Sequence, residues 1–310
     1  MRLYPISLYF LILAAATGSL ASSGDRSNEF QRCLQQCVRQ SCALDGQQHS
    51  LRPQPFVLRL TRWTCMDNCK YTCMHTLTDL AIESGVRMQQ YYGKWPFWRF
   101  AGMQEPASVA FSLANLLMHV LGADWLRRGV HPAHPMRPFY LTWAYVSINA
   151  WIWSAVFHTR DTPLTERLDY FSAALAILYA LYMAVVRLFH LYAGTPTFPS
   201  RPSRRPLFHV WRALSTLVYF AHIAYLGFAA PFTRFAAMPR SYRPAHAGTA
   251  ALAVALTTAA TALELFDFPP WGRVLDAHAL WHLATVPLAV MWYDFLLMDA
   301  QDAGWRGQRL

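Results

Sequence analysis

The stretch NAWIWSAVFHTRDTPLTERLDYFSAA, from Asn149 to Ala174, decides how the chain is interpreted. It joins two apolar runs, yet it carries Ser154 and His158 one helical turn apart and Asp169 at the start of the second run. Ionisable side chains at membrane depth are costly, and for that reason they usually mark functional sites. The stretch therefore predicts a polar site inside a membrane-embedded fold, with partners from elsewhere in the chain.

The overall composition agrees with a membrane location. Of the 310 residues, 55% are hydrophobic and only 14% are charged, whereas a soluble domain carries about 25% charged residues. We therefore expect an all-α polytopic membrane protein. The formal net charge of +10 does not predict a nucleic-acid partner, because no run rich in Lys and Arg with interleaved aromatic residues occurs.

The first residues, MRLYPISLYFLILAAATGSLASS, combine a basic start with a short apolar run and small residues at Ser19 and Ala21. This pattern predicts a signal peptide over residues 1–21, cleaved after Ala21, and an uncleaved signal anchor is the alternative. The region that follows is then expected in the lumen of the secretory pathway.

All six cysteines lie between this signal and the first apolar span: Cys33, Cys37, Cys42, Cys65, Cys69 and Cys73. An even number in a short translocated segment predicts disulfides, three in all, whose pairing the sequence leaves open. Most are four residues apart and so share a face if their segments are helical. We expect a lumenal, disulfide-rich helical domain over residues 22–100. Zinc binding by the thiols is the alternative, which an oxidising lumen disfavours.

Six apolar runs are long enough to cross about 30 Å of hydrocarbon; they cover about 107–126, 139–159, 169–189, 207–229, 246–266 and 275–298. Arginines follow the first run (Arg127, Arg128) and the third (Arg201, Arg204, Arg205), which places those loops in the cytosol.

With six crossings the last two apolar runs would cross the membrane in the inverted orientation, and His158 and His278 would lie at opposite membrane surfaces. A further short pass within 224–242, broken by Pro231, brings both to the lumenal side. We therefore predict a seven-transmembrane-helix bundle with one atypical span. Residues 101–300 form the transmembrane domain, and 301–310 form a cytosolic tail.

The last run supplies partners for His158. In ELFDFPPWGRVLDAHALWHLATVP, His278 and His282 are four residues apart and project from one helical face. Three histidines with an open fourth position are typical of catalytic zinc, which lowers the pKa of a bound water from about 16 to about 7. Ser154 is then a candidate oxyanion or water partner, and Asp169 a candidate proton carrier.

Each of these residues also has a simpler interpretation. A His-x-x-x-His pair in a membrane helix more often makes interhelical hydrogen bonds than it binds a metal. Ser154 alone is typical of a small packing residue, and Asp169 alone of a helix cap. The conjunction of the five residues is what favours a site. The other histidines, including His119, His190, His209 and His222, are assigned no role.

These residues resemble the CREST superfamily of membrane hydrolases and, more closely, the post-GPI-attachment to proteins factor 3 family. The resemblance covers nearly the whole chain and is carried by long Trp-rich segments; these are SSGDRSNEFQRC, WTCMDNCKYTCM, QYYGKWPFWRFAGMQEPASVAFSLANLLMH, NAWIWSAVFHTRDTPLTERLDYFSA and ELFDFPPWGRVLDAHALWHLATVP. The chain departs from the family pattern in GFAAPFTRFAAM, where relatives show a well-formed span.

The resemblance implies GPI-anchor lipid remodelling in the endoplasmic reticulum or Golgi membrane, by hydrolysis of the sn-2 acyl ester of the GPI phosphatidylinositol. By this resemblance His158, His278 and His282 look like Zn²⁺ ligands, and Ser154 and Asp169 look like catalytic residues. The expected partners are GPI-anchored proteins, their phosphatidylinositol lipid and membrane lipids. A ceramidase-like amide hydrolase and a non-catalytic receptor or escort for GPI-anchored proteins remain as alternatives.

Overall fold

The computed structural model describes residues 22–43, 50–51, 53–188, 246–265 and 267–302. Within them every regular element is a helix, and β-pairing is limited to isolated bridges. The helices are α2 (Asn28–Ser41), α3 (Phe56–Leu60), α4 (Cys65–Glu83), α5 (Pro106–Gly129), α6 (Arg137–Thr159), α7 (Pro163–Leu188), α10 (Ala247–Leu265) and α11 (Ala277–Gln301). The expectation of an all-α protein is confirmed for this part of the chain.

The chain divides into two compact units. The first runs to Pro106 and also includes Phe268–Asp276, and the second comprises Ala107–Asp267 and the chain from Ala277 onward. The expected signal peptide, the span at 207–229, the short pass at 224–242 and the tail beyond Asp302 lie outside the described residues. Each unit is described by itself below.

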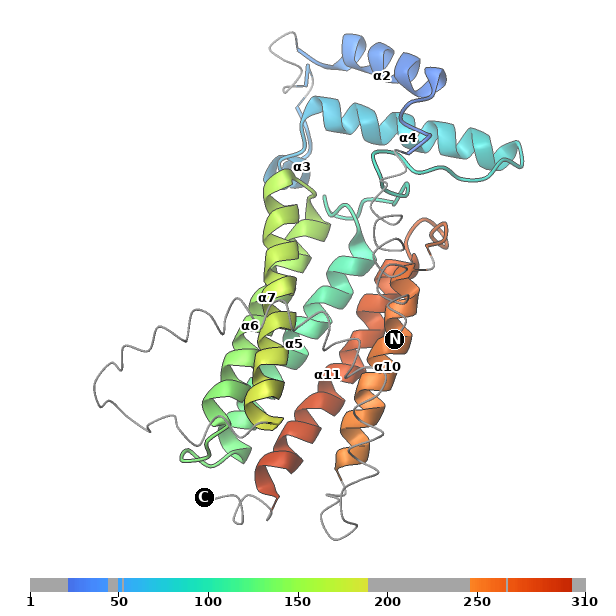
Figure 1. The fold of residues 1–310 in the computed structure, drawn as a ribbon. Coiled ribbons are helices and arrows are strands. Elements are labelled where there is room, and N and C mark those ends of the chain that lie inside the picture. The colour runs from blue at the N-terminus through green and yellow to red at the C-terminus, as the bar shows by residue number, and fades with distance from the viewer. Residues whose placement is uncertain (1–21, 44–49, 52, 189–245, 266, 303–310) are drawn as a thin grey trace, which may run out of the picture. The chain divides into compact units, whose positions relative to one another are not determined.

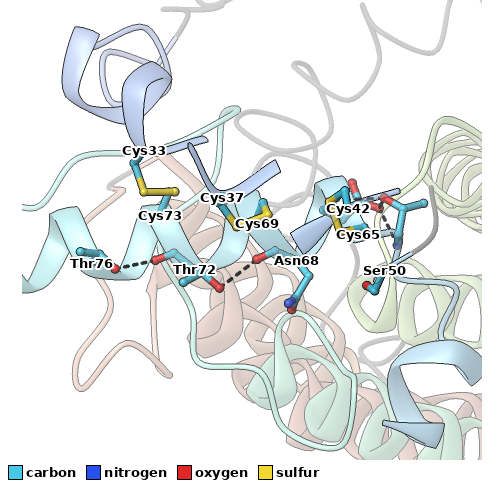
Figure 2. Close-up of a disulfide and its surroundings, with 12 residues drawn as sticks. Cys33, Cys37, Cys42, Ser50, Cys65, Asn68, Cys69, Thr72, Cys73 and Thr76 are labelled. Atoms are coloured by element: carbon cyan, nitrogen blue, oxygen red, sulfur yellow. Dashed lines mark hydrogen bonds between the residues drawn. A yellow bond between two sulfur atoms is a disulfide. The ribbon is translucent and has the colours of Figure 1, made fainter. Parts of the chain in front are cut away.

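Three disulfides join α2 and its C-cap residue to α4 in the first unit: Cys33–Cys73, Cys37–Cys69 and Cys42–Cys65. The residue numbers rise along α2 as they fall along α4, so the two helices are antiparallel (Figure 2). The expected number of disulfides is confirmed. Because every cysteine is paired, these sulfurs are not available as thiolate metal ligands.

Local sequence explains where both helices begin. The Ser27 hydroxyl accepts a hydrogen bond from the Phe30 backbone N–H at the start of α2. Thr64 and Asp67 form a reciprocal capping box at the start of α4. Apolar residues of α2 spaced four apart, Phe30, Leu34 and Val38, are buried with the α4 cysteines and form the core of this unit.

Phe268–Asp276 joins the first unit through Arg273, which sequence analysis did not anticipate. The Arg273 guanidinium lies 2.5 Å from an Asp79 carboxylate oxygen and 3.0 Å from His75 Nδ1. Its backbone carbonyl accepts a hydrogen bond from the Trp98 N–H at 3.0 Å. His75 Nε2 in turn lies 3.0 Å from the Phe97 carbonyl oxygen, and its ring stacks on Trp98. His75 thus has a partner at each nitrogen and a fixed neutral tautomer.

In the described part of the second unit, five long helices run alongside one another (Figure 1). Four of them, α5, α7, α10 and α11, are long and apolar enough to cross a membrane. Helix α6 has 23 residues but is not among those four. Helix α7 begins six residues before its expected start at 169, because Thr162 caps it and Pro163 occupies its first position.

Close helix packing holds this unit together. Helix α6 packs against α7, and α10 packs against α11. Gly122 of α5 touches the Tyr293 ring of α11 so closely that a Cβ at this position would collide with it. The hydrophobic effect does not drive helices together in lipid, so membrane helices associate through close packing. Small residues at such crossings let their backbones approach. The Tyr293 hydroxyl also lies 2.9 Å from His119 Nδ1, which anchors α11 to α5.

Candidate metal centre

The three predicted histidines converge in the second unit. His158 is the last residue but one of α6, and His278 and His282 lie on the first two turns of α11. Their candidate ligand nitrogens all lie within 4.8 Å of one another. His158 Nε2 is 3.3 Å from His278 Nε2, which is 2.8 Å from His282 Nε2. Residues 120 positions apart in sequence therefore meet at the same end of the helices.

The ring nitrogens on the far side of two of these histidines are anchored. His278 Nδ1 lies 2.9 Å from both carboxylate oxygens of Glu264, at the end of α10. His282 Nδ1 lies 3.1 Å from the Ser112 hydroxyl of α5. An ionised carboxylate only accepts hydrogen bonds, so Nδ1 of His278 carries a proton, and the Nε2 of the neutral ring then presents a lone pair to the cluster.

This arrangement fits a zinc ion. Nitrogens bound to one tetrahedral zinc at 2.0–2.1 Å lie about 3.3 Å apart. The separation between His158 and His278 matches this spacing, and the separation between His278 and His282 is shorter. A carboxylate behind a ligating imidazole is the usual partner of a zinc-bound histidine. His158 and His282 are each 2% exposed, whereas the His278 side chain is 32% exposed. His278 is therefore the accessible member of the cluster.

Ser154 is buried one turn before His158 on α6, and its hydroxyl lies 3.0 Å from the Ser112 hydroxyl. Ser112 therefore links Ser154 to His282. Asp169 is half-buried on the second turn of α7 and is not in the group of ligand atoms that lie within 4.8 Å of one another. Since the helix is capped at Thr162, Asp169 is not an N-cap residue, which excludes that simpler interpretation.

Sequence analysis missed Ser112, Asn115 and Glu264. Ser112 and Asn115 are fully buried on α5, and the Asn115 amide donates to the His282 carbonyl at 2.8 Å. Their spacing was a usable signal, because polar residues at 108, 112, 115 and 119 fall on one face of an otherwise apolar helix. Glu264 was visible as a single acidic residue at the end of an apolar run.

Aromatic side chains form a wall beside the histidines. Trp151 meets the His282 ring edge-on at 5.3 Å between centroids, and Trp281 lies 5.6 Å from the His278 ring. Phe157 lies 5.1 Å from the His158 ring. The cluster is therefore polar at its centre and apolar around it, a combination typical of sites that take small molecules or lipid chains.

Fold and site together define a polytopic α-helical membrane protein with a three-histidine candidate metal centre near one end of its helices. Comparison with known proteins narrows this class. The chain belongs to the Per1-like family, whose model matches residues 55–234 and 229–300. This match and the named relatives described next confirm the resemblance to the post-GPI-attachment to proteins factor 3 family.

Curated relatives match almost end to end. A Bos taurus protein named "GPI-specific phospholipase A2-like PGAP3" is 37% identical over 309 residues, which cover 94% of this chain and 93% of the relative. The Homo sapiens protein of the same name is 36% identical, with 94% and 93% covered. The Drosophila melanogaster "Post-GPI attachment to proteins factor 3" is 38% identical, with 93% and 92% covered. No solved structure matches the chain.

Proposed function

We propose that the chain remodels the lipid of GPI anchors by zinc-dependent hydrolysis of the sn-2 acyl ester of the GPI phosphatidylinositol, giving a lyso-GPI-anchored protein. The convergence of His158, His278 and His282 is the observation that carries the proposal. The names of relatives that match over 94% of the chain supply the substrate. A zinc ion held by the three Nε2 atoms would act as a Lewis acid and lower the pKa of water to about 7.

The chain's own residues have separate tasks in this reaction. Water oxygen bonds to the acyl carbonyl carbon, and the bond from that carbon to the glycerol oxygen breaks. Ser154 donates a hydrogen bond to the carbonyl oxygen as negative charge develops on it. Asp169 accepts the proton of the water and returns it to the departing glycerol oxygen. The products are a free fatty acid and the lyso lipid, so atoms and charge balance.

The depth of the site suits an ester bond of a lipid. His158 is one residue from the end of α6, and His282 is five residues beyond the start of α11, about 8 Å along the helix. Acyl esters of membrane lipids lie at a similar depth, at the boundary between headgroups and chains. The aromatic wall of Trp151, Trp281 and Phe157 would face the acyl chain.

The described helices support the seven-span topology and a lumenal site. Contacts of His278 with His158 and Glu264 place the end of α6, the end of α10 and the start of α11 at one end of the unit. Helix α7 therefore ends, and α10 begins, at the opposite end, which agrees with the two crossings that the sequence predicts between them, at 207–229 and within 224–242. Two crossings give seven in all. The disulfides of residues 22–100 favour the lumen of the endoplasmic reticulum or Golgi.

The test uses the purified full-length chain in vesicles that contain a diacyl-GPI-anchored protein. The expected products are free fatty acid and the lyso form, with zinc required. His278→Ala should abolish release, whereas the matched control His131→Ala, at an exposed loop histidine, should retain it. Release from wild type and His278→Ala at equal rates would contradict the proposal.

The same assay separates the alternatives. A ceramidase-like amidase would release fatty acid from ceramide and leave diacyl GPI intact. A non-catalytic receptor or escort would bind GPI-anchored proteins without releasing fatty acid from either lipid. The present proposal expects release from diacyl GPI alone.

A further inference from the structure

Ser112 of α5 touches both a candidate metal ligand, His282, and the candidate oxyanion residue, Ser154. Its hydroxyl oxygen lies 3.1 Å from His282 Nδ1 and 3.0 Å from the Ser154 hydroxyl oxygen. Ser112 is fully buried, and so is Asn115 one turn later, whose amide donates to the His282 backbone carbonyl. Helix α5 thus holds His282 at both its ring and its backbone.

Once His282 serves as a metal ligand, the protons available on these groups fix which group donates in each hydrogen bond. A neutral imidazole that offers the Nε2 lone pair carries its proton on Nδ1. That proton points to the Ser112 oxygen. Ser112 has a single proton of its own, which is then directed to the Ser154 oxygen. The Ser154 proton is left to point away from Ser112, so Ser154 becomes a donor.

We propose that Ser112 is a positioning residue that holds His282 in the Nδ1–H tautomer and orients Ser154 as a hydrogen-bond donor to the substrate carbonyl oxygen. The second half of this inference, the orientation of Ser154, rests on the proposed function, because a hydrogen-bond donor is useful where negative charge develops. Its first half concerns metal affinity alone. Partners behind a ligand histidine typically change metal affinity about 10- to 100-fold when removed.

Zinc affinity tests the first half without any turnover. In the purified full-length chain, competition with a chelator should show that Ser112→Ala weakens zinc binding about 10-fold, and that Ser112→Thr, which keeps a hydroxyl, recovers most of the loss. The matched control is Ser108→Ala, one turn earlier on α5. Ser108 is 2% exposed and makes no hydrogen bond to an imidazole within the described residues. The Ser108→Ala variant should bind zinc as wild type does.

A double-mutant cycle at saturating zinc tests the second half. Ser112→Ala should lower kcat for fatty-acid release with little change in KM. If Ser112 acts through Ser154, the Ser112→Ala/Ser154→Ala double variant should be no slower than Ser154→Ala alone. Ser108→Ala should leave kcat unchanged in both backgrounds.

The outcomes distinguish the two proposals. Unchanged zinc affinity in Ser112→Ala, or rate losses that multiply in the double variant, would overturn the role of Ser112. A wild-type chain that binds zinc tightly but releases no fatty acid would overturn the proposed function. In that case the zinc affinity of Ser112→Ala still decides whether Ser112 holds His282.

Discussion

Helix α11 carries a polar cluster at each end, and the two clusters differ in what satisfies them. Near its start, His158, His278 and His282 turn Nε2 atoms toward one another. Near its end, the buried Asp299 carboxylate receives two guanidinium N–H groups from Arg187, at 2.8 and 2.9 Å, and the Tyr140 hydroxyl at 2.7 Å. His246 lies 3.6 Å from the same carboxylate.

This difference distinguishes a cluster that stabilises the fold from a candidate functional cluster. The Asp299 cluster joins α6, α7 and α11 and is complete in itself, since a negative charge meets a positive charge and a hydroxyl donor. The histidine cluster brings three imidazole nitrogens together and is backed by the carboxylate of Glu264, which favours a cation at its centre. We therefore assign the first cluster to stability and the second to function, and the following predictions test that division.

The largest effect is expected on removal of a histidine. His282→Ala leaves only two imidazoles, too few for a three-histidine zinc site. Metal content measured by mass spectrometry should fall from one zinc per chain to less than about 0.1. The chain should remain folded, as judged by its thermal transition in detergent. Wild-type metal content in this variant would contradict the functional assignment of the cluster.

Removal of Asp299 should have the opposite profile. Asp299→Ala leaves the Arg187 guanidinium in a largely buried site without its carboxylate, which typically costs about 3–5 kcal/mol. The melting temperature should drop sharply, while the folded fraction should still bind zinc at one per chain.

Simultaneous replacement by Asp299→Leu and Arg187→Met is the control, because it removes both charges and should recover much of the lost stability. A loss of zinc from the folded Asp299→Ala chain would show that the two clusters are not independent.

His75, in the first unit, is a buried histidine kept neutral by its protein partners, and it sharpens the comparison. Burial lowers the pKa of His75 to about 4, with Arg273 adding to the effect. The unfolded chain takes up this proton below about pH 6.5, while the folded chain resists uptake until about pH 4.

Protonation of His75 therefore leaves the free energy of unfolding unchanged above pH 6.5 and lowers it as the pH falls from 6.5 toward 4. The slope is at most about 1.4 kcal/mol per pH unit. Thermal unfolding at pH 7.5, 6.5, 5.5 and 4.5 should show this decline in wild type and a shallower one in His75→Gln. Parallel profiles for the two chains would refute the assignment.

The smallest effect is expected at Glu264. Glu264→Ala should weaken zinc binding about 10-fold, because His278 loses the acceptor that fixes its Nδ1 proton. Glu264→Gln keeps an oxygen acceptor without the charge and should weaken binding less. Chelator competition measures both. Equal affinity in wild type and Glu264→Ala would show that the carboxylate is a surface group without a role in the centre.

Much of this fold could be predicted from the sequence, because it follows from local pattern. Apolar runs predicted five of the described long helices, and the cysteine spacing predicted two stapled ones. The pairing of cysteines was not predictable, since most of them are four residues apart and offer several partners on similar helical faces. Nor was the position of Phe268–Asp276 in the first unit, which depends on contacts of Arg273 with residues almost 200 positions earlier.

The candidate site divides in the same way. The three histidines were recognisable from their residue type and spacing. Ser112 and Glu264 were not singled out, because serines and single carboxylates are common and their contacts depend on how α5 and α10 lie beside α11. Asp169 was expected beside His158 across a short loop. Since α7 begins at Pro163, Asp169 lies on the second turn of that helix rather than at its start, and its proximity to His158 stays a prediction.

The central claim is that three distant imidazoles hold one zinc ion, and X-ray absorption at the zinc edge of the purified full-length chain tests it most directly. We predict three nitrogen scatterers with an imidazole signature at about 2.0–2.1 Å, together with one further light atom. The imidazole signature should disappear in His158→Ala. A chain purified in zinc-containing buffer that retains no zinc, or that holds it through sulfur at about 2.3 Å, would contradict the account.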